Sequence, residues 1–140
     1  ITEPLKSGTF VTDHTSAGEY QIVVLASDGE MEAKKTISLV VEDVNVLPVI
    51  SNLQDLTVKE GELVKIVPEV EDLDGDDITL TISNPVGDTG EWQTSFTDNG
   101  VYTVTVTAED GKDKVIERIT ITVEDVNMPP EIVEVELQRN

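Results

Sequence analysis

The feature that most constrains the fold of this chain is an internal repeat. Residues 18–50 and 100–132 align without a gap at an offset of 82 residues, and 14 of the 33 aligned positions are identical, including the whole string V-E-D-V-N. Phe10 and Trp92 fall at the same offset. A period of this length is that of a small domain rather than of a short solenoid repeat. The chain is therefore predicted to contain copies of one unit of about 82 residues.

The offset divides the 140 residues into three unequal parts. Residues 1–48 correspond to the second half of a unit, residues 49–129 to a complete unit, and residues 130–140 to the start of a third unit or to a tail. Half a unit exposes a sheet edge and half of a core. We expect either the rest of a longer protein or a neighbouring molecule to supply the missing strands.

Apolar and polar residues alternate almost everywhere, as they do in strands with one buried face. Tyr102, Val104 and Val106, for example, alternate with threonines, and Asp-Gly and Asn-Gly turn signals separate such runs. No segment carries a helical stripe. The pattern predicts an all-β fold, an Ig-like antiparallel β-sandwich. Strands A, B, C, E, F and G of the complete unit are expected at 54–60, 63–70, 77–83, 91–97, 101–109 and 115–124, and residues 1–48 are expected to carry the equivalents of E, F and G.

A short motif supports the sandwich. Residues 98–102 read D-N-G-V-Y, the pattern of a tyrosine corner at the start of strand F, in which the tyrosine hydroxyl bonds to the backbone upstream. Residues 16–20 are a looser copy of it. The aromatic residues all fall at positions that the alternation assigns to the core, namely Phe10, Tyr20, Trp92, Phe96 and Tyr102.

Acidic residues dominate the charge of the chain. Asp and Glu total 29 against 9 Lys and Arg, which gives a formal net charge of −20 at pH 7. Such a charge excludes direct binding to nucleic-acid phosphates or to an anionic membrane surface, and it favours cations as partners. The lack of cysteine excludes disulfides and thiolate metal sites, and the single histidine, His14, is expected to be solvated. No run of 18 apolar residues occurs, so no membrane-spanning segment is predicted.

Three motifs resemble those of a known family. Residues 106–111 read V-T-A-E-D-G and residues 123–130 read V-E-D-V-N-M-P-P, which together resemble the ending of cadherin repeats. Residues 70–80, V-E-D-L-D-G-D-D-I-T-L, are similar to the D-x-D-G-D segment of microbial dystroglycan-type cadherin-like repeats. Asp43-Val44-Asn45 and Asp125-Val126-Asn127 match the start of the cadherin linker, whereas Val46-Leu47 and Met128-Pro129 depart from it. The resemblance implies tandem Ig-like repeats of a cell-surface protein, joined through calcium.

The predicted fold also indicates where carboxylates would meet. In an Ig-like sandwich the B–C and F–G loops lie at the end where the chain arrives, so residues 71–77 and 110–111 should meet the linker at 43–45. Clustered carboxylates repel one another unless a cation neutralises them, and calcium accepts about six to eight oxygens in a flexible geometry. Solvated acidic loops, in which Asp-Gly is simply a turn former, are the alternative. The predicted calcium ligands are Asp43, Asn45, Asp72, Asp74 and Asp110, with Asp76 and Asp77 as weaker candidates, and Glu60, Glu62, Asp125 and Asn127 as weaker candidates at the opposite end.

These features favour a structural or adhesive segment of an extracellular or cell-surface array of Ig-like repeats, such as a stalk, an adhesin or an S-layer element. Neighbouring units of the same protein are the expected partners, together with other copies of it in a surface assembly, and Ca²⁺ is the expected cofactor. Two alternatives stay open: a carbohydrate-binding accessory module of a secreted enzyme, and a strand-exchanged subunit of a surface filament or sheath. No enzyme activity is expected, because a small sandwich offers little cleft for its carboxylates.

Overall fold

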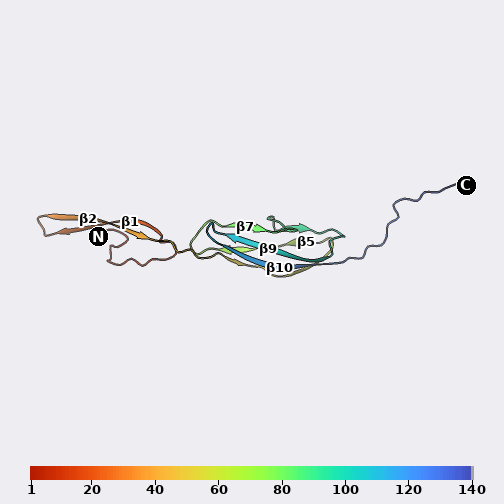
Figure 1. Cartoon of the computed structure of the whole chain (residues 1–140), viewed down its shortest axis with the longest axis horizontal. Coiled ribbons are helices and arrows are strands. Elements are labelled where there is room, and N and C mark those ends of the chain that lie inside the picture. Colours follow the sequence, from red (N-terminus) through yellow and green to blue (C-terminus); the bar gives the residue numbers. More distant parts are fainter. Residues whose placement is uncertain (140) are drawn as a thin grey trace. The chain divides into compact units, whose positions relative to one another are not determined.

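A computed structural model of the chain describes residues 1–139 (Figure 1). Within that range the chain forms strands and turns but no helix, and so it has no helix that is long and apolar enough to cross a membrane. The predicted all-β class is confirmed. The strands are β1 (Gly18–Ser27), β2 (Glu32–Val41), β3 (Val49–Ser51), β4 (Leu56–Lys59), β5 (Leu63–Lys65), β6 (Glu69–Glu71), β7 (Thr79–Ile82), β8 (Glu91–Gln93), β9 (Gly100–Glu109) and β10 (Lys114–Glu124).

Contacts between backbone positions group the chain into two compact units. Unit 1 comprises Ile1–Ser51, Glu69–Leu80 and Thr107–Val115, and unit 2 comprises Asn52–Pro68, Thr81–Val106 and the chain from Ile116 onward. Because these units follow contacts and not the repeat, the domain boundaries predicted after residues 48 and 129 stay predictions. Residues 125–139 form no strand, and Asn140, the last residue of the predicted third segment, lies outside the described residues.

In unit 1, β1 and β2 form a long antiparallel hairpin. Its register runs from Gly18 opposite Val41 to Ser27 opposite Glu32. Ile22 in the middle of β1 is 1% exposed, whereas Leu25 in the same strand is 56% exposed. The apolar residues of this hairpin are therefore only partly covered.

The largest sheet has the strand order β4-β10-β9-β7, and β4 runs parallel to β10. Every second residue of β9 from Val104 to Ala108 is fully buried, and so is Ile121 of β10. This is the period of two that the sequence predicts for a sheet with one buried face. In unit 2 the remaining buried apolar side chains are Val64, Ile66, Ile82, Val86, Ile119 and Val123.

The predicted strand at 63–70 is wrong, because two short strands take its place. In unit 2, β5 pairs antiparallel with β8, and in unit 1, β6 pairs antiparallel with β3. Pro68 stands between β5 and β6, and its nitrogen has no hydrogen to donate to a ladder. Strand β3 was not predicted, since three residues are too few to show a period, and the predicted strand at 91–97 ends at Gln93.

Both predicted tyrosine corners are confirmed. The hydroxyl of Tyr102 donates to the backbone oxygen of Asp98 at 2.8 Å, and the hydroxyl of Tyr20 donates to that of Ser16 at 2.8 Å. Each tyrosine ring also meets an aromatic ring edge-on, Trp92 at a centroid distance of 4.8 Å in one copy and Phe10 at 5.3 Å in the other. The repeat in sequence is thus a repeat in local structure.

The prediction that every aromatic residue lies in the core is wrong for Phe96, whose side chain is 54% exposed. Its ring instead covers the turn at Gly61, where an added Cβ would lie only 3.1 Å from Phe96 Cζ. The alternation assigned Phe96 to a strand, but β8 ends at Gln93, so the period no longer decides which way this side chain points.

Candidate metal centre

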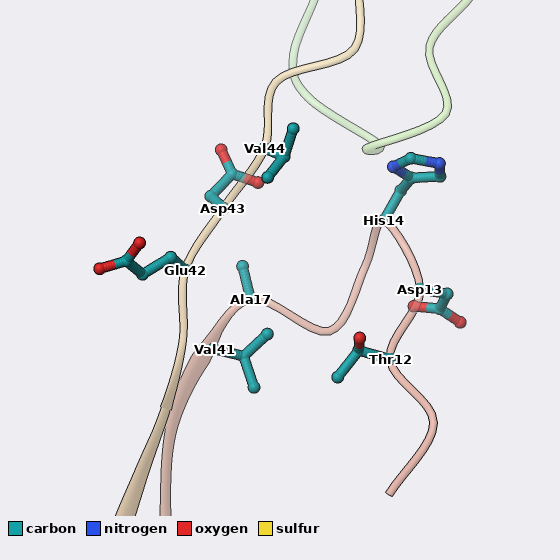
Figure 2. A pocket seen from close by; sticks show the side chains of 8 residues that line it. All are labelled: Thr12, Asp13, His14, Ala17, Val41, Glu42, Asp43 and Val44. Atoms are coloured by element: carbon teal, nitrogen blue, oxygen red, sulfur yellow. The ribbon is translucent and has the colours of Figure 1, made fainter.

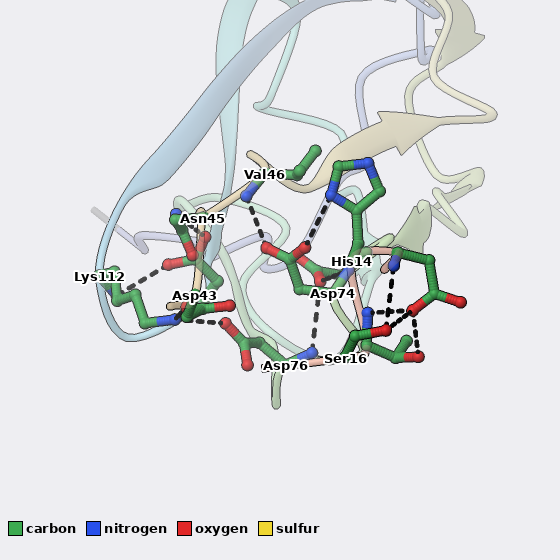
Figure 3. Close-up of polar contacts among 12 residues, drawn as sticks. His14, Ser16, Asp43, Asn45, Val46, Asp74, Asp76 and Lys112 are labelled. Atoms are coloured by element: carbon green, nitrogen blue, oxygen red, sulfur yellow. Dashed lines mark hydrogen bonds and ion pairs between the residues drawn. The ribbon is translucent and has the colours of Figure 1, made fainter. Parts of the chain in front are cut away.

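Three segments that are distant in sequence meet within unit 1 (Figure 3). They are the linker between β2 and β3, the loop between β6 and β7, and the turn between β9 and β10. Their polar side chains form what we call the junction cluster: Asp43, Asn45, Asp72, Asp74, Asp76, Asp110, Lys112 and Asp113. It contains the five predicted main ligands and Asp76. Asp77 is exposed, and in the described part of the chain it makes no hydrogen bond or ion pair with the cluster.

Two aspartates of the cluster shape the loops that carry them. Asp72 Oδ1 accepts hydrogen bonds from the backbone N–H groups of Asp74 at 2.9 Å and Asp76 at 3.3 Å. Asp110 Oδ1 accepts in the same way from Lys112 at 2.7 Å and Asp113 at 2.6 Å. Such turns are the local reason for aspartate at these positions. The bonds to Asp113 and then to Asn45 and Lys112 lower the pKa of Asp110, so this carboxylate stays charged.

Side-chain contacts hold the linker against the two loops. The amide nitrogen of Asn45 donates to Asp110 Oδ2 at 3.0 Å and to Asp113 Oδ2 at 3.1 Å. The backbone N–H of Val46 donates to Asp74 Oδ2. The linker is therefore placed by carboxylates of both neighbouring loops.

Lys112 is a member of the junction cluster that the sequence does not predict. Its ammonium group pairs with Asp43 of the linker and with Asp76 of the β6–β7 loop, the latter at 3.2 Å from Nζ to Oδ2 (Figure 3). The hydrogen bonds to Asp43 and Asp76 raise the pKa of Lys112, so it remains a cation. The signal available in the sequence was a lysine directly after Asp110-Gly111, in a chain with few basic residues.

His14 also approaches the cluster, although its side chain is 53% exposed. Its Nδ1 lies 3.6 Å from Asp74 Oδ1, which is too long for a hydrogen bond. His14 is therefore exposed, as expected, but it also lies close to a carboxylate of the junction cluster.

Three buried oxygen atoms of the cluster have no hydrogen-bond partner: Asn45 Oδ1, Asp72 Oδ2 and Asp74 Oδ1. The side chain of Asp74 is only 2% exposed. A buried oxygen without a partner costs about 1–3 kcal/mol, so each of these atoms needs a donor or a cation. Because the hydrogen bonds of Asp72 and Asn45 use their other polar atoms, the unpaired oxygens are free to act as ligands.

The donor chemistry of the cluster fits a hard divalent cation. Carboxylate and amide oxygens are the ligands that calcium prefers, and the three unpaired oxygens come from two of the converging segments. In residues 1–139, no group of three or more His, Cys, Asp or Glu side chains is already arranged to hold a metal ion. Lys112 stands between Asp43 and Asp76, so these two carboxylates can join a common ion only after the ammonium group moves.

A hollow of about 350 Å³ adjoins the cluster at Asp43 and His14 (Figure 2). One wall is the segment 12–17, and the other is the end of β2 with the start of the linker. Its lining residues are Thr12, Asp13, His14, Ala17, Val41, Glu42, Asp43 and Val44. Asp43, whose side chain is 36% exposed, is the member of the junction cluster that lines this hollow.

The weaker candidates at the opposite end of the predicted unit lie in unit 2, where the two glutamates bind backbone N–H groups. Glu60 is 4% exposed, and its carboxylate accepts from the N–H of Asn99 at 2.8 Å and of Val126 at 3.0 Å. Glu62 Oε2 accepts from the N–H of Lys59 at 2.7 Å. Among the described residues, no hydrogen bond or ion pair joins Asp125 or Asn127 to either glutamate. This group resembles a backbone clamp more closely than a metal site.

Comparison with solved structures finds likenesses at low sequence identity, among them the following two. An endo-fucoidan hydrolase from glycoside hydrolase family 107 is 20% identical with a TM-score of 0.42, over 81% of this chain and 20% of the hydrolase. Drosophila N-cadherin EC1-3 is 19% identical with a TM-score of 0.43, over 78% of this chain and 44% of the cadherin. The chain thus spans about a fifth of the hydrolase and less than half of the cadherin.

The sequence itself matches a protein family. No curated protein matches the chain. The family described as the bacterial Ig domain matches residues 45–136, about two thirds of the chain. This match agrees with the strand pattern, the sheets and the tyrosine corners described above, and it confirms the predicted Ig-like resemblance. The chain belongs to the bacterial Ig domain family.

Proposed function

We propose that this chain is a structural segment of an extracellular or cell-surface array of Ig-like repeats, and that calcium bound at the junction cluster makes the connection between repeats rigid. The proposed ligands come from the linker and from two loops that the repeat assigns to the following unit, and hydrogen bonds hold the linker against both loops. Oxygens that share one ion would fix the angle at which the linker leaves the loops. Without the ion, the carboxylates of the junction cluster repel one another.

The observation that carries this proposal is the set of unpaired buried oxygens of Asn45, Asp72 and Asp74. An acidic loop that is only solvated turns its oxygens to water, whereas these three are closed off from it. Their side chains are already positioned by other hydrogen bonds, so binding costs little ordering of the loops.

The extracellular setting follows from affinity and from the family. Extracellular calcium modules commonly have dissociation constants of about 10⁻⁴ to 10⁻³ M, which load outside a cell and stay empty in cytosol. Bacterial Ig domains are usually extracellular or surface modules. A net charge of −20 also favours a medium rich in cations.

The proposal is tested by thermal melts of the 140-residue chain in EDTA, in a few millimolar calcium and in equal magnesium. We expect calcium to raise the unfolding midpoint and magnesium to raise it much less, because magnesium demands a tighter octahedral geometry. The double substitution Asp72→Asn and Asp74→Asn retains the turn and the acceptor for Val46, but it removes two ligand charges. It should abolish the calcium-specific shift.

Asp77→Asn is the matched control, because it removes one charge from the same loop at a position outside the cluster. Its calcium response should match that of the wild type. Calorimetric titration gives the stoichiometry independently of the melt. If the wild-type midpoint moves equally in calcium and magnesium, and no calcium binding is detected by titration, the junction is an acidic spacer without a metal site.

A further inference from the structure

We propose that Lys112 is a built-in counter-ion that competes with calcium for Asp43 and Asp76 and holds the junction together when calcium is absent. This inference rests on the proposed calcium site and concerns its regulation. One ammonium group links the linker to the β6–β7 loop, while the backbone of the same residue binds Asp110 in the β9–β10 turn. A single residue therefore connects all three converging segments.

The charges of the cluster explain why such a lysine matters. The junction cluster contains six aspartate carboxylates and one ammonium group, which pairs with two of them. The side chains that Lys112 neutralises are the more accessible ones, Asp43 at 36% and Asp76 at 32% exposure. It makes no hydrogen bond with the buried oxygens Asp72 Oδ2 and Asp74 Oδ1, which have no hydrogen-bond partner, although His14 Nδ1 lies 3.6 Å from the latter. The ammonium group thus neutralises the more exposed carboxylates of the junction cluster and does not reach the buried oxygens.

The other copy of the repeat shows that the turn itself does not need a lysine. Glu30 stands at the position equivalent to Lys112. Asp28 Oδ1 nevertheless accepts from the N–H of Glu30 at 3.0 Å and of Met31 at 2.8 Å, as Asp110 does from Lys112 and Asp113. Because the same backbone bonds form with glutamate at this position, the lysine side chain serves the cluster and not the turn.

Calcium and the ammonium group need the same oxygens. A cation that takes Asp43 as a ligand must displace Lys112, since both charges cannot share that carboxylate without strong repulsion. The residue therefore lowers the affinity for calcium and also limits the repulsion among carboxylates in the metal-free state. Removing it should raise the affinity for calcium and lower the stability of the metal-free junction.

The test is calorimetric titration of calcium into the wild type, Lys112→Gln and Lys114→Gln, with melts of each in EDTA and in saturating calcium. Lys114→Gln removes the same charge two residues away, and Lys114 makes no ion pair within the described residues. We expect Lys112→Gln to tighten calcium binding about tenfold and Lys114→Gln to tighten it less than about threefold. In EDTA the Lys112 variant should melt below the Lys114 variant, and in saturating calcium the two should converge.

The outcomes separate this inference from the proposal on which it rests. If the wild type binds calcium and Lys112→Gln binds it no more tightly than Lys114→Gln, the competition is refuted while the site stands. Weaker binding by Lys112→Gln would mean that the ammonium group supports the ligands, and it would overturn the inference equally. If the wild type binds no calcium, the wild-type titration alone refutes both.

Discussion

The side-chain amide of Asn45 donates a hydrogen bond to Asp110, 65 residues later in the chain, at 3.0 Å. This bond ties the linker to the β9–β10 turn through side chains. Asp110 is itself 6% exposed, and its other oxygen closes the turn that carries it. The arrangement leaves the amide oxygen of Asn45 buried without a partner. The linker is thus positioned by the groups that we propose as calcium ligands.

Glu60 is predicted to be a structural residue of unit 2. Replacement by alanine leaves the N–H groups of Asn99 and Val126 without their acceptor. Since both groups lie beside a residue that is 4% exposed, we expect a loss of about 2–4 kcal/mol in the free energy of unfolding, measured by urea titration in EDTA. Glu62→Ala is the control and should cost less than about 1 kcal/mol, because Glu62 is exposed. Equal losses of unfolding free energy in Glu60→Ala and Glu62→Ala would show that Glu60 does not hold these backbone groups in place.

Gly90 and Gly87 give a matched test of steric packing in unit 2. Both have left-handed backbone conformations, with φ of +72° and +71°. A Cβ on Gly90 would lie 2.6 Å from the backbone oxygen of Ile66, whereas a Cβ on Gly87 meets nothing within 4 Å. Alanine should cost about 1 kcal/mol at Gly87, from backbone strain alone, and about 3 kcal/mol at Gly90. Similar unfolding free energies for the two variants would contradict this expectation.

The repeating parts of the fold could be predicted from the sequence. Strands β9 and β10 are long enough to show a period of two, and the D-x-G-x-Y motif fixed the tyrosine corner, so both were correct. The wrong strand predictions lie where a proline interrupts a strand or where the alternation of apolar and polar residues is too short to recognise. Pro68 splits a strand whose alternation continues through it, and β3 is too short to have a period.

The junction cluster was predictable only in part. The topology of the sandwich predicts that the acidic loops and the linker lie close together, because loops at one end of it are near each other. The topology does not say which side chains pair. Lys112 lies in a turn that the sequence predicts from its aspartate and glycine alone, and its contacts with Asp43 and Asp76 depend on a long side chain that no periodicity places. Calcium binding remains a prediction.

The hydroxyl group of Tyr102 offers a test of the tyrosine corner. Tyr102→Phe removes the hydrogen bond to the backbone of Asp98 but retains the ring that packs against Trp92. We expect it to lower the unfolding free energy by about 1 kcal/mol. Tyr102→Leu removes the aromatic contact as well and should cost at least about 1 kcal/mol more. A phenylalanine variant as stable as the wild type in urea titration would show that the corner contributes nothing.

Asp98, whose backbone oxygen accepts the hydrogen bond from Tyr102, should also make the stability of the fold depend on pH. Its Oδ2 accepts hydrogen bonds from the backbone N–H of Ser95 at 2.7 Å and from the Ser95 hydroxyl at 2.8 Å. These bonds lower the pKa of Asp98 below its usual value of 3.8. Because the pKa is lower in the folded state than in the unfolded state, the carboxylate stabilises the fold above pH 3.8, and this contribution is lost as the pH falls through the folded-state pKa.

We therefore expect the stability difference between the wild type and Asp98→Asn to be constant at neutral pH and to shrink below pH 3.8. The difference is the informative quantity, since acid also protonates the other carboxylates and relieves the repulsion of a chain with net charge −20. Urea titrations in EDTA from pH 7 down to pH 2.5 measure it. Ser95→Ala removes one of the two donors and should retain part of the pH dependence. A difference that stays flat through the acid range would show that these bonds do not favour the charged form of Asp98.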